Sequence, residues 1–260
     1  MRISSKGRRR SAWIAVSVFL AAATASRAYI LEVQSNGATV PFWPKGTVTM
    51  QLQLDPTPLG TTLIDGSTSW GQSAEAALAD WNTHLGNLQF LVVRNSTASI
   101  AELNGYNNVF WSSTVYGESW GTLGAQVIAY TLYWWVGSQR TEADVIFNNN
   151  ISFNSYRGNL VNGSDGKILD DFRRVALHEF GHVLCLNHPD QNGQNVVAIM
   201  NSVTSNTYDL TADDIAGAQV AYSAPAGNTA PSIAVQPKGA SLAFRASVTL
   251  TVTPSGCPSW

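Results

Sequence analysis

The stretch HEFGHVLCLNH at residues 178–188 constrains this chain more than any other. If it begins as a helix, His178 and His182 lie one turn apart on one face, where two imidazoles can bind one divalent ion. Glu179 follows the first histidine and can reach a water molecule on that ion. His188 comes six residues after His182, so it can return to the ion only if the helix ends and the chain turns. Three histidines and a water would complete a four-coordinate zinc site with one open position.

Two unrelated histidines on the surface of a helix are the alternative interpretation. The chain contains only four histidines, and three of them lie in this stretch, which favours the metal site. The fourth, His84, falls at the end of another predicted helix. An exposed or hydrogen-bonded histidine is favoured there, because the motif already supplies three ligands.

These residues resemble the signature H-E-x-x-H-x-x-G-x-x-H of the metzincin zinc peptidases. Their surroundings resemble the matrixin branch, particularly its secreted bacterial members. The resemblance implies a catalytic Zn²⁺ ion held by the three motif histidines, with Glu179 as general base. It extends over about residues 29–223 and is strongest from 170 to 222.

Cys185 stands where that signature has glycine. Glycine can take a positive φ, which ends the helix sharply and swings the third histidine toward the zinc. A cysteine in that conformation costs about 1 kcal/mol or more, which zinc binding can offset. Alternatively, the Cys185 thiolate is itself a ligand or a redox brake, although a small half-buried thiol is the favoured interpretation. With Cys257 as the only other cysteine, both are predicted to be unpaired.

Met200 follows the third histidine by twelve residues, at the end of the apolar run 196–200. Its position resembles the Met-turn of metzincins, a tight turn that places a thioether beneath the zinc. An ordinary core methionine is the alternative. Ser202 stands two residues later, where the astacin and serralysin branches carry a tyrosine ligand, and this difference favours a matrixin-like site.

Hydrophobic patterning predicts five strands, at residues 47–54, 88–93, 107–111, 125–130 and 142–147. It also predicts three helices. The first covers 73–85, with Ser73 as N-cap and Ala76, Leu78 and Trp81 near one face. The other two cover 170–185 and 211–222, the latter opened by a capping box of Thr211 and Asp214 and presenting Ile215, Ala218, Val220 and Tyr222 on its apolar side.

This order of elements is typical of an α/β or an α+β protein, and we expect the α+β class. The resemblance implies the metzincin, or zincin-like, fold: a twisted, mainly parallel sheet with an active-site helix, and a small C-terminal subdomain with the Met-turn and a terminal helix. It also implies that the strand around 125–130 is an edge strand that pairs with extended substrate. Gly181 within the active-site helix costs about 1 kcal/mol relative to alanine, which suggests a close neighbour there.

The N-terminus is typical of a signal peptide. Basic residues at 6–10 precede the apolar run 11–25, and two small-x-small sites end at Ala25 and Ala28. A membrane anchor is the alternative, but the run is short for a span. We therefore expect residues 1–28 to be a signal peptide and the mature protein to be secreted, extracellular and without a stable membrane anchor.

The predicted peptidase domain covers 29–223, and the composition changes at Ala224. Residues 224–260 are predicted to be a linker and a partial immunoglobulin-like segment, with a strand in SVTLTVT. Because two or three strands cannot bury a sandwich core, this segment is either truncated, frayed or docked on the peptidase.

Composition limits the partners. Charged residues make up 12% of the 260 residues, the net charge is −2, and no basic patch follows the N-terminus, so nucleic acid is not expected as a partner. Protein or peptide substrates and a monomeric state are expected. A structural Ca²⁺ ion could bind Asp165 with Gly166, or Asp170 with Asp171, in or after the polar loop 148–169. The favoured alternative is a solvated loop whose last two aspartates begin the helix.

The sequence therefore predicts a secreted zinc endopeptidase in which a zinc-activated water, with Glu179 as general base, hydrolyses peptide bonds. The alternative function is a zinc-binding but weakly active adhesion module linked to immunoglobulin-like repeats, suggested by Cys185 and by the incomplete tail. The presence of Glu179 argues against the adhesion module, because an inactive site has no need of a general base.

Overall fold

The computed structural model describes residues 28–34, 36–55, 62–124, 126–163 and 166–223, with two short strands in the tail. The predicted signal peptide therefore lies outside the described residues except for Ala28, and so does Cys257. In the tail, β12 (Ser232–Val235) pairs antiparallel with β13 (Thr253–Ser255). The rest of the predicted immunoglobulin-like segment lies outside the described residues.

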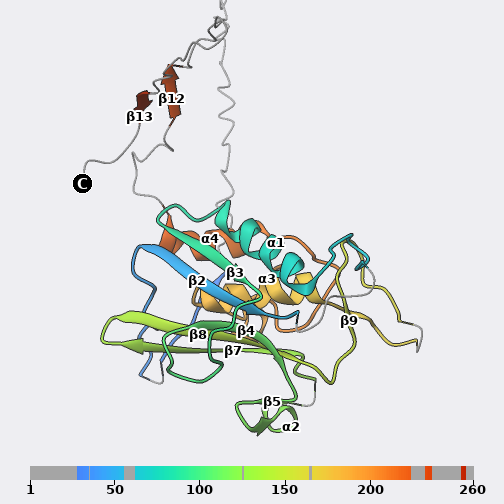
Figure 1. Ribbon diagram of the computed structural model, residues 1–260. Coiled ribbons are helices and arrows are strands. Elements are labelled where there is room, and N and C mark those ends of the chain that lie inside the picture. The colour runs from blue at the N-terminus through green and yellow to red at the C-terminus, as the bar shows by residue number, and fades with distance from the viewer. Residues whose placement is uncertain are drawn as a thin grey trace, which may run out of the picture.

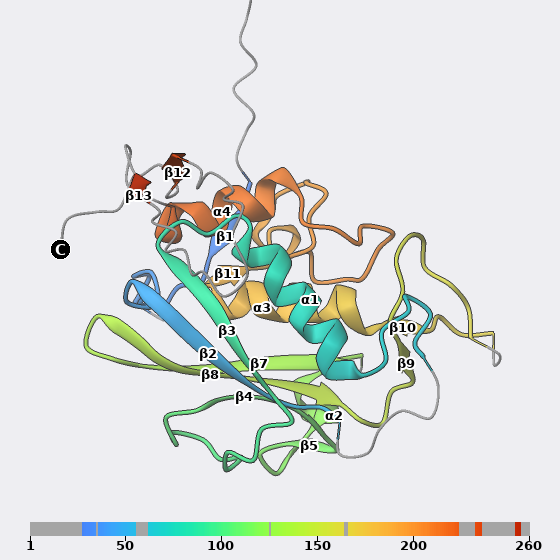
Figure 2. The ribbon, with the colours of Figure 1, turned by 45° about the horizontal axis from the view of Figure 1, so that its top comes forward.

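A five-stranded sheet forms the centre of the molecule (Figures 1 and 2). Its strands, in spatial order, are β3 (Leu88–Arg94), β2 (Gly46–Gln53), β4 (Asn107–Ser112), β8 (Gln139–Asn148) and β7 (Ala129–Val136). The first four are parallel, and β7 runs antiparallel to β8 at one edge. This confirms the predicted, mainly parallel sheet.

Helices α1 (Trp70–Asn82) and α3 (Phe172–Val183) pack on each other and cover one face of this sheet (Figures 1 and 2). Helix α4 (Ala212–Tyr222) lies on the same side. The opposite face carries a small layer made of β5 (Thr114–Val115), β6 (Glu118–Ser119) and α2 (Trp120–Leu123). Among the described residues, no helix is long and apolar enough to span a membrane.

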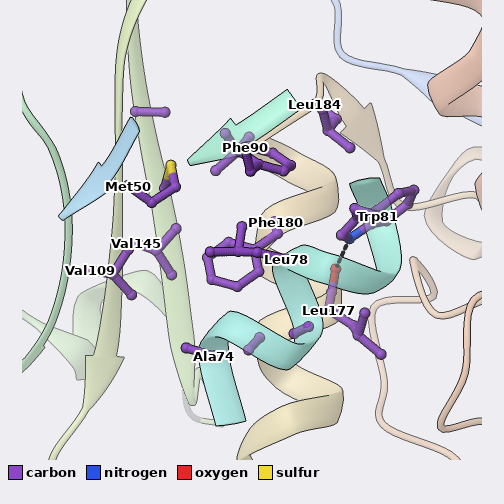
Figure 3. Packing of buried hydrophobic residues seen from close by; sticks show 14 of the residues in the cluster. Met50, Ala74, Leu78, Trp81, Phe90, Val109, Val145, Leu177, Phe180 and Leu184 are labelled. Carbon is purple, nitrogen blue, oxygen red and sulfur yellow. Dashed lines mark hydrogen bonds between the residues drawn. The ribbon is translucent and has the colours of Figure 1, made fainter. Parts of the chain in front are cut away.

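The main core fills the space between the sheet and its two helices. Figure 3 shows Phe180 of α3 among Leu78 of α1 and the sheet residues Phe90 and Val145, all of them buried. The indole Nε1 of Trp81 donates a 3.0 Å hydrogen bond to the Leu177 carbonyl, so the largest core side chain also satisfies its polar atom. Burial of this set fixes α3, and with it the metal-binding motif, against a rigid scaffold.

Helix α1 begins three residues earlier than predicted. Its N-cap is Ser69, whose hydroxyl accepts from Gln72 N–H at 3.0 Å, so the assignment of Ser73 as N-cap is wrong. Ser73 is instead buried and hydrogen-bonds to Ser155. The Asp55 carboxylate accepts from the first two backbone N–H groups of the helix, both at 2.8 Å. This contact between distant parts of the chain favours the earlier start.

Two predictions of which side chains face the core are also wrong. Ala76, expected on the apolar side of α1, is exposed, and Ala74 and Ala77 occupy the buried face instead. Val220, expected on the apolar side of α4, is exposed as well. The capping box of that helix is present as predicted.

The edge strand lies later in the chain than the sequence predicts. Predicted at 125–130, it runs from Ala129 to Val136 as β7, because it forms a hairpin with β8 whose register extends to Val136↔Gln139. Its place at the edge of the sheet is as expected.

Two further pairs of short strands lie outside the five-stranded sheet. β1 (Ile30–Leu31) pairs antiparallel with β11 (Leu186–Asn187). β9 (Phe153–Asn154) pairs parallel with β10 (Asp170–Asp171). A 3-10 turn, η1 (Asp190–Asn192), follows the third histidine. The β1–β11 pair matters for the site because it joins the N-terminal segment to the end of the metal-binding motif.

Asp144 is a buried carboxyl on the face of β8 that the small outer layer covers. It accepts hydrogen bonds from Asn108 N–H at 2.7 Å and from the Tyr116 hydroxyl at 2.6 Å. Burial raises its pKa from 3.8 to about 7, against the lowering effect of these two bonds, and the nearby charge of Glu142 adds to the rise. Between about pH 4 and pH 7 the folded protein therefore holds a proton that the unfolded chain has released, so this group destabilises the fold increasingly as pH rises.

Asp144→Asn is expected to remove that penalty. Because one pH unit of pKa displacement is worth 1.36 kcal/mol, the variant should gain up to about 4 kcal/mol over wild type at pH 8. Little of this gain should remain at pH 4, where wild-type Asp144 is protonated. Urea unfolding of both proteins at the two pH values measures the difference. A difference that does not grow with pH would contradict the assignment of a raised pKa to Asp144.

Candidate metal centre and active site

Helix α3 carries the first part of the motif, and its two ends are built by local contacts. The Asp171 side chain caps the start by accepting from Arg173 N–H at 3.2 Å. At the other end, Cys185 has φ of +71°, and its N–H donates to the His182 carbonyl at 2.9 Å. This left-handed residue stops the helix and redirects the chain, as the sequence predicted for this position.

The turn brings the three motif histidines together. The Nε2 atoms of His178, His182 and His188 are separated by 3.0 to 3.1 Å in all three pairs. Among the His, Cys, Asp and Glu side chains that the structure describes, these three form the one group that could hold a metal ion. His84 is not part of it. The expected convergence of His188 with the helical pair is therefore present despite Cys185.

The opposite nitrogen of each ring has its own acceptor. Nδ1 of His178 lies 2.8 Å from the Ile199 carbonyl, and Nδ1 of His182 lies 2.8 Å from the Leu186 carbonyl. Nδ1 of His188 lies 3.0 Å from Oε1 of Gln191. Because carbonyl oxygens only accept, each Nδ1 carries the proton and each Nε2 presents a lone pair to the same point.

Three converging lone pairs repel one another unless a cation lies between them. Zinc binds histidine nitrogen at about 2.0–2.1 Å, and three nitrogens 3.0 to 3.1 Å apart can all approach one ion at that distance. The donor set therefore fits zinc, with a fourth position left for water or substrate.

The histidines differ in their electrostatic environment. Burial lowers the pKa of His178 to well below its ordinary value, and burial also lowers the pKa of His188. For His182, burial likewise lowers the pKa, but the neighbouring Glu32 carboxylate and the charge of Glu179 outweigh it and leave the pKa raised. Metal binding requires neutral imidazoles, and burial favours the neutral form at His178 and His188.

Glu179 lies buried beside the histidines, on the wall of a cleft. Its Oε2 accepts a 2.6 Å hydrogen bond from the hydroxyl of Thr131 on β7. Burial raises the pKa of Glu179, partly offset by the neighbouring His182 and by the Thr131 bond. A carboxylate with raised pKa and one fixed oxygen is suited to general base chemistry.

Met200 packs against α3 at Gly181, the residue before His182. A Cβ built on Gly181 would come within 2.2 Å of the Met200 sulfur. Met200 is therefore the close neighbour that a glycine inside this helix suggested. The turn is held by Asp214 of α4, whose carboxylate accepts from the N–H groups of Ile199 and Met200 at 3.0 and 3.1 Å. Since the Ile199 carbonyl in turn faces His178, this turn supports a candidate ligand directly.

A cleft of about 920 Å³ runs past these residues. It is lined by Tyr130 and Thr131 of β7, by Val175 and the two helical histidines of α3, and by His188. Residues 198–199, 201–205 and 207 line it as well. An extended chain could lie in this cleft beside the edge strand, with its backbone next to the three histidines.

The thiol of Cys185 points away from the histidines. Its Sγ lies 3.5 Å from the Pro41 carbonyl and 3.9 Å from the Tyr222 hydroxyl. Burial raises its pKa to about 11, so the thiol is protonated at neutral pH. These contacts favour the structural interpretation of Cys185 over a role as zinc ligand or redox brake.

Cys185→Gly and Cys185→Ala together test the left-handed turn. Both variants remove the thiol, but only glycine relieves a φ of +71°. The glycine variant should therefore be the more stable of the two, by about 1 kcal/mol. Urea unfolding of the metal-free proteins measures this difference. Equal stability, or a more stable alanine variant, would contradict the left-handed conformation.

The structure describes only one of the two residue pairs that were candidates for binding calcium. Asp165 lies outside the described residues. Asp171 caps α3 and lies 3.3 Å from the Arg174 guanidinium, and both it and Asp170 belong to β10. This geometry favours the capping interpretation for the second pair, and a calcium requirement stays a prediction.

The sequence did not predict a role at the site for five further residues. They share a supporting role, because each contacts a candidate ligand, the base or the turn: Glu32, Thr131, Arg140, Gln191 and Asp214. Of these, only Asp214 belonged to a recognisable sequence pattern, the capping box of α4. The others are brought to the site by the tertiary fold or by the turn after His188.

The comparisons with known proteins agree with this geometry. The family model described as Matrixin, a peptidase family, matches residues 43–223. The match includes the whole sheet, the three histidines, Met200 and α4. No curated protein matches the chain.

Proposed function

This chain belongs to the matrixin family of zinc metallopeptidases, and from that premise we propose that it is a zinc-dependent endopeptidase with Glu179 as its general base. The observation that carries the proposal is the convergence of three Nε2 lone pairs beside a buried carboxylate. In this proposal His178, His182 and His188 bind the catalytic ion.

A zinc ion bound by these three histidines would polarise the scissile carbonyl and lower the pKa of a bound water toward neutrality. Glu179 takes a proton from the attacking water and then delivers it to the leaving amine. Thr131 holds Oε2 of Glu179 through its 2.6 Å hydrogen bond, which leaves Oε1 to exchange the proton. The Nδ1 acceptors keep each imidazole in the tautomer that presents Nε2.

The proposed substrate is an extended peptide that adds to the free edge of β7. Backbone hydrogen bonds give such pairing an affinity that depends little on sequence, and selectivity then comes from side chains that enter the cleft. The 920 Å³ volume is within the range of sites that hold several substrate side chains or a small ligand.

The proposed location is outside the cell, because the N-terminal sequence is typical of a signal peptide. The alternative function, a weakly active adhesion module, has less support. Glu179 is intact and is held by Thr131, and an inactive module would have no use for that bond.

Peptide hydrolysis tests the proposal. The purified chain, stripped of metal, should not cleave casein or a mixture of unstructured peptides, and one equivalent of zinc should restore cleavage within the peptide chains. Mass spectrometry of the products separates internal cuts from removal of terminal residues. Zinc binding without any cleavage would favour the adhesion module, and cleavage that survives complete metal removal would contradict the proposal.

A further inference from the structure

The N-terminal segment lies against the metal centre although it precedes the matrixin match, which begins at residue 43. Strand β1 pairs with β11, immediately before His188. The N–H groups of Ala28 and Tyr29 donate to Oδ1 of Asp213 at 2.8 and 3.0 Å. Glu32 N–H donates to the Cys185 carbonyl at 2.9 Å. These bonds hold the segment beside the turn that redirects the motif.

Glu32 directs its carboxylate toward a zinc-binding histidine. Its Oε1 lies 3.4 Å from Nδ1 of His182, and its Oε2 lies 3.1 Å from Nη2 of Arg140. The residue is only 7% exposed. The Leu186 carbonyl, at 2.8 Å, is the nearer acceptor for the same Nδ1. Glu32 therefore adds a negative charge beside a ring whose hydrogen bond is already made.

Arg140 connects that carboxylate to the backbone of the same histidine. Its Nη1 donates to the carbonyls of His182 and Val183 at 2.8 and 2.9 Å. The guanidinium stacks over the ring of Tyr133, 4.1 Å from the centroid, and its side chain is completely buried. The ion pair thus contacts His182 at both its imidazole and its carbonyl.

We propose that Glu32 is a positioning residue for the metal centre: its charge, held beside Nδ1 of His182 by Arg140, strengthens the bond of that imidazole to zinc. The inference rests on the proposed zinc site. A carboxylate near the distal nitrogen of a ligand histidine makes the metal-binding nitrogen more basic. The N-terminal segment then becomes part of the metal centre, and the catalytic domain requires residues that the family match does not include.

Zinc affinity, measured by competition with a chromophoric chelator, tests this directly. Glu32→Gln keeps the size of the side chain and an accepting oxygen but removes the charge, and it should weaken zinc binding by about 10-fold or more. Glu32→Asp keeps the charge, and its affinity should lie between those of wild type and Glu32→Gln.

Two controls separate this role from a merely structural one. Glu142→Gln makes the same substitution at another buried glutamate, which bonds to Gly105 N–H, and should leave zinc affinity unchanged. Asp213→Ala removes the acceptor for Ala28 and Tyr29 but leaves the β1–β11 pair and the bond from Glu32 N–H to the Cys185 carbonyl, so it should bind zinc as wild type does. Circular dichroism of each metal-free protein confirms that the compared variants are folded. If a variant folds only with zinc, the zinc concentration at which half of its molecules are folded replaces the affinity in the comparison.

The outcomes are distinct. Wild-type affinity in Glu32→Gln would overturn the inference, and so would an equal loss in Asp213→Ala, which would assign the effect to docking of the segment. Failure of the wild-type chain to bind zinc would instead overturn the proposed function on which the inference rests.

Discussion

Replacement of Glu179 by glutamine is expected to lower kcat by about 10²- to 10⁴-fold, the range for loss of a positioned general base. Glutamine has nearly the same size and can still accept the hydrogen bond from Thr131, which in the wild type is 2.6 Å long. It cannot take the proton from water. Because the carboxylate is not among the converging Nε2 ligands, zinc should remain bound.

Steady-state kinetics on one peptide substrate, together with zinc analysis, check this expectation. Glu142→Gln is the matched control, since it removes a buried carboxylate far from the histidines in sequence and without contact to them; its kcat should match wild type. Full activity in zinc-loaded Glu179→Gln would exclude Glu179 as the base. Loss of zinc in that variant would show that the residue supports the ligands rather than the chemistry.

Arg140→Met is expected to lower the free energy of unfolding by about 3–5 kcal/mol, the usual cost of removing one partner from a buried ion pair. The substitution leaves the Glu32 carboxylate buried without its cation. It also removes the donors to the carbonyls of His182 and Val183. The effect should be largest in the metal-free protein, where zinc does not hold His182.

Urea unfolding of the metal-free protein measures this loss. The double variant Glu32→Gln, Arg140→Met should recover part of the stability, because no buried charge is left unpaired. Arg94→Met serves as control: Arg94 pairs with Glu75 on the surface, and its removal should cost less than about 1 kcal/mol. An Arg140→Met protein as stable as the Arg94→Met protein would contradict the buried ion pair.

The chemistry of the site was predictable because it depends on local spacing. His178 and His182 share a helical face by geometry alone, and a left-handed residue after the helix was required if His188 was to return. Cys185 has that conformation although it lacks the freedom of glycine. The position of Gly181 also indicated a close neighbour, which is Met200.

The parts that could not be predicted depend on contacts between distant residues. The Asp55 carboxylate extends the start of α1 by accepting hydrogen bonds from the N–H groups of Trp70 and Gly71. No local sequence pattern predicts this contact. The β7–β8 hairpin sets the bounds of the edge strand by register rather than by hydrophobic alternation. Glu32 reaches His182 across 150 residues of sequence, because β1 pairs with β11.

The central claim is that three histidines hold one zinc ion, and metal analysis of the purified chain tests it most directly. Wild type and His188→Ala should be reconstituted with zinc, dialysed and analysed side by side. The account predicts one zinc per wild-type chain and loss or marked weakening in the variant, because His188 supplies one of three converging Nε2 atoms. A wild-type chain that binds no zinc, or a His188→Ala chain that binds it unchanged, would contradict the account.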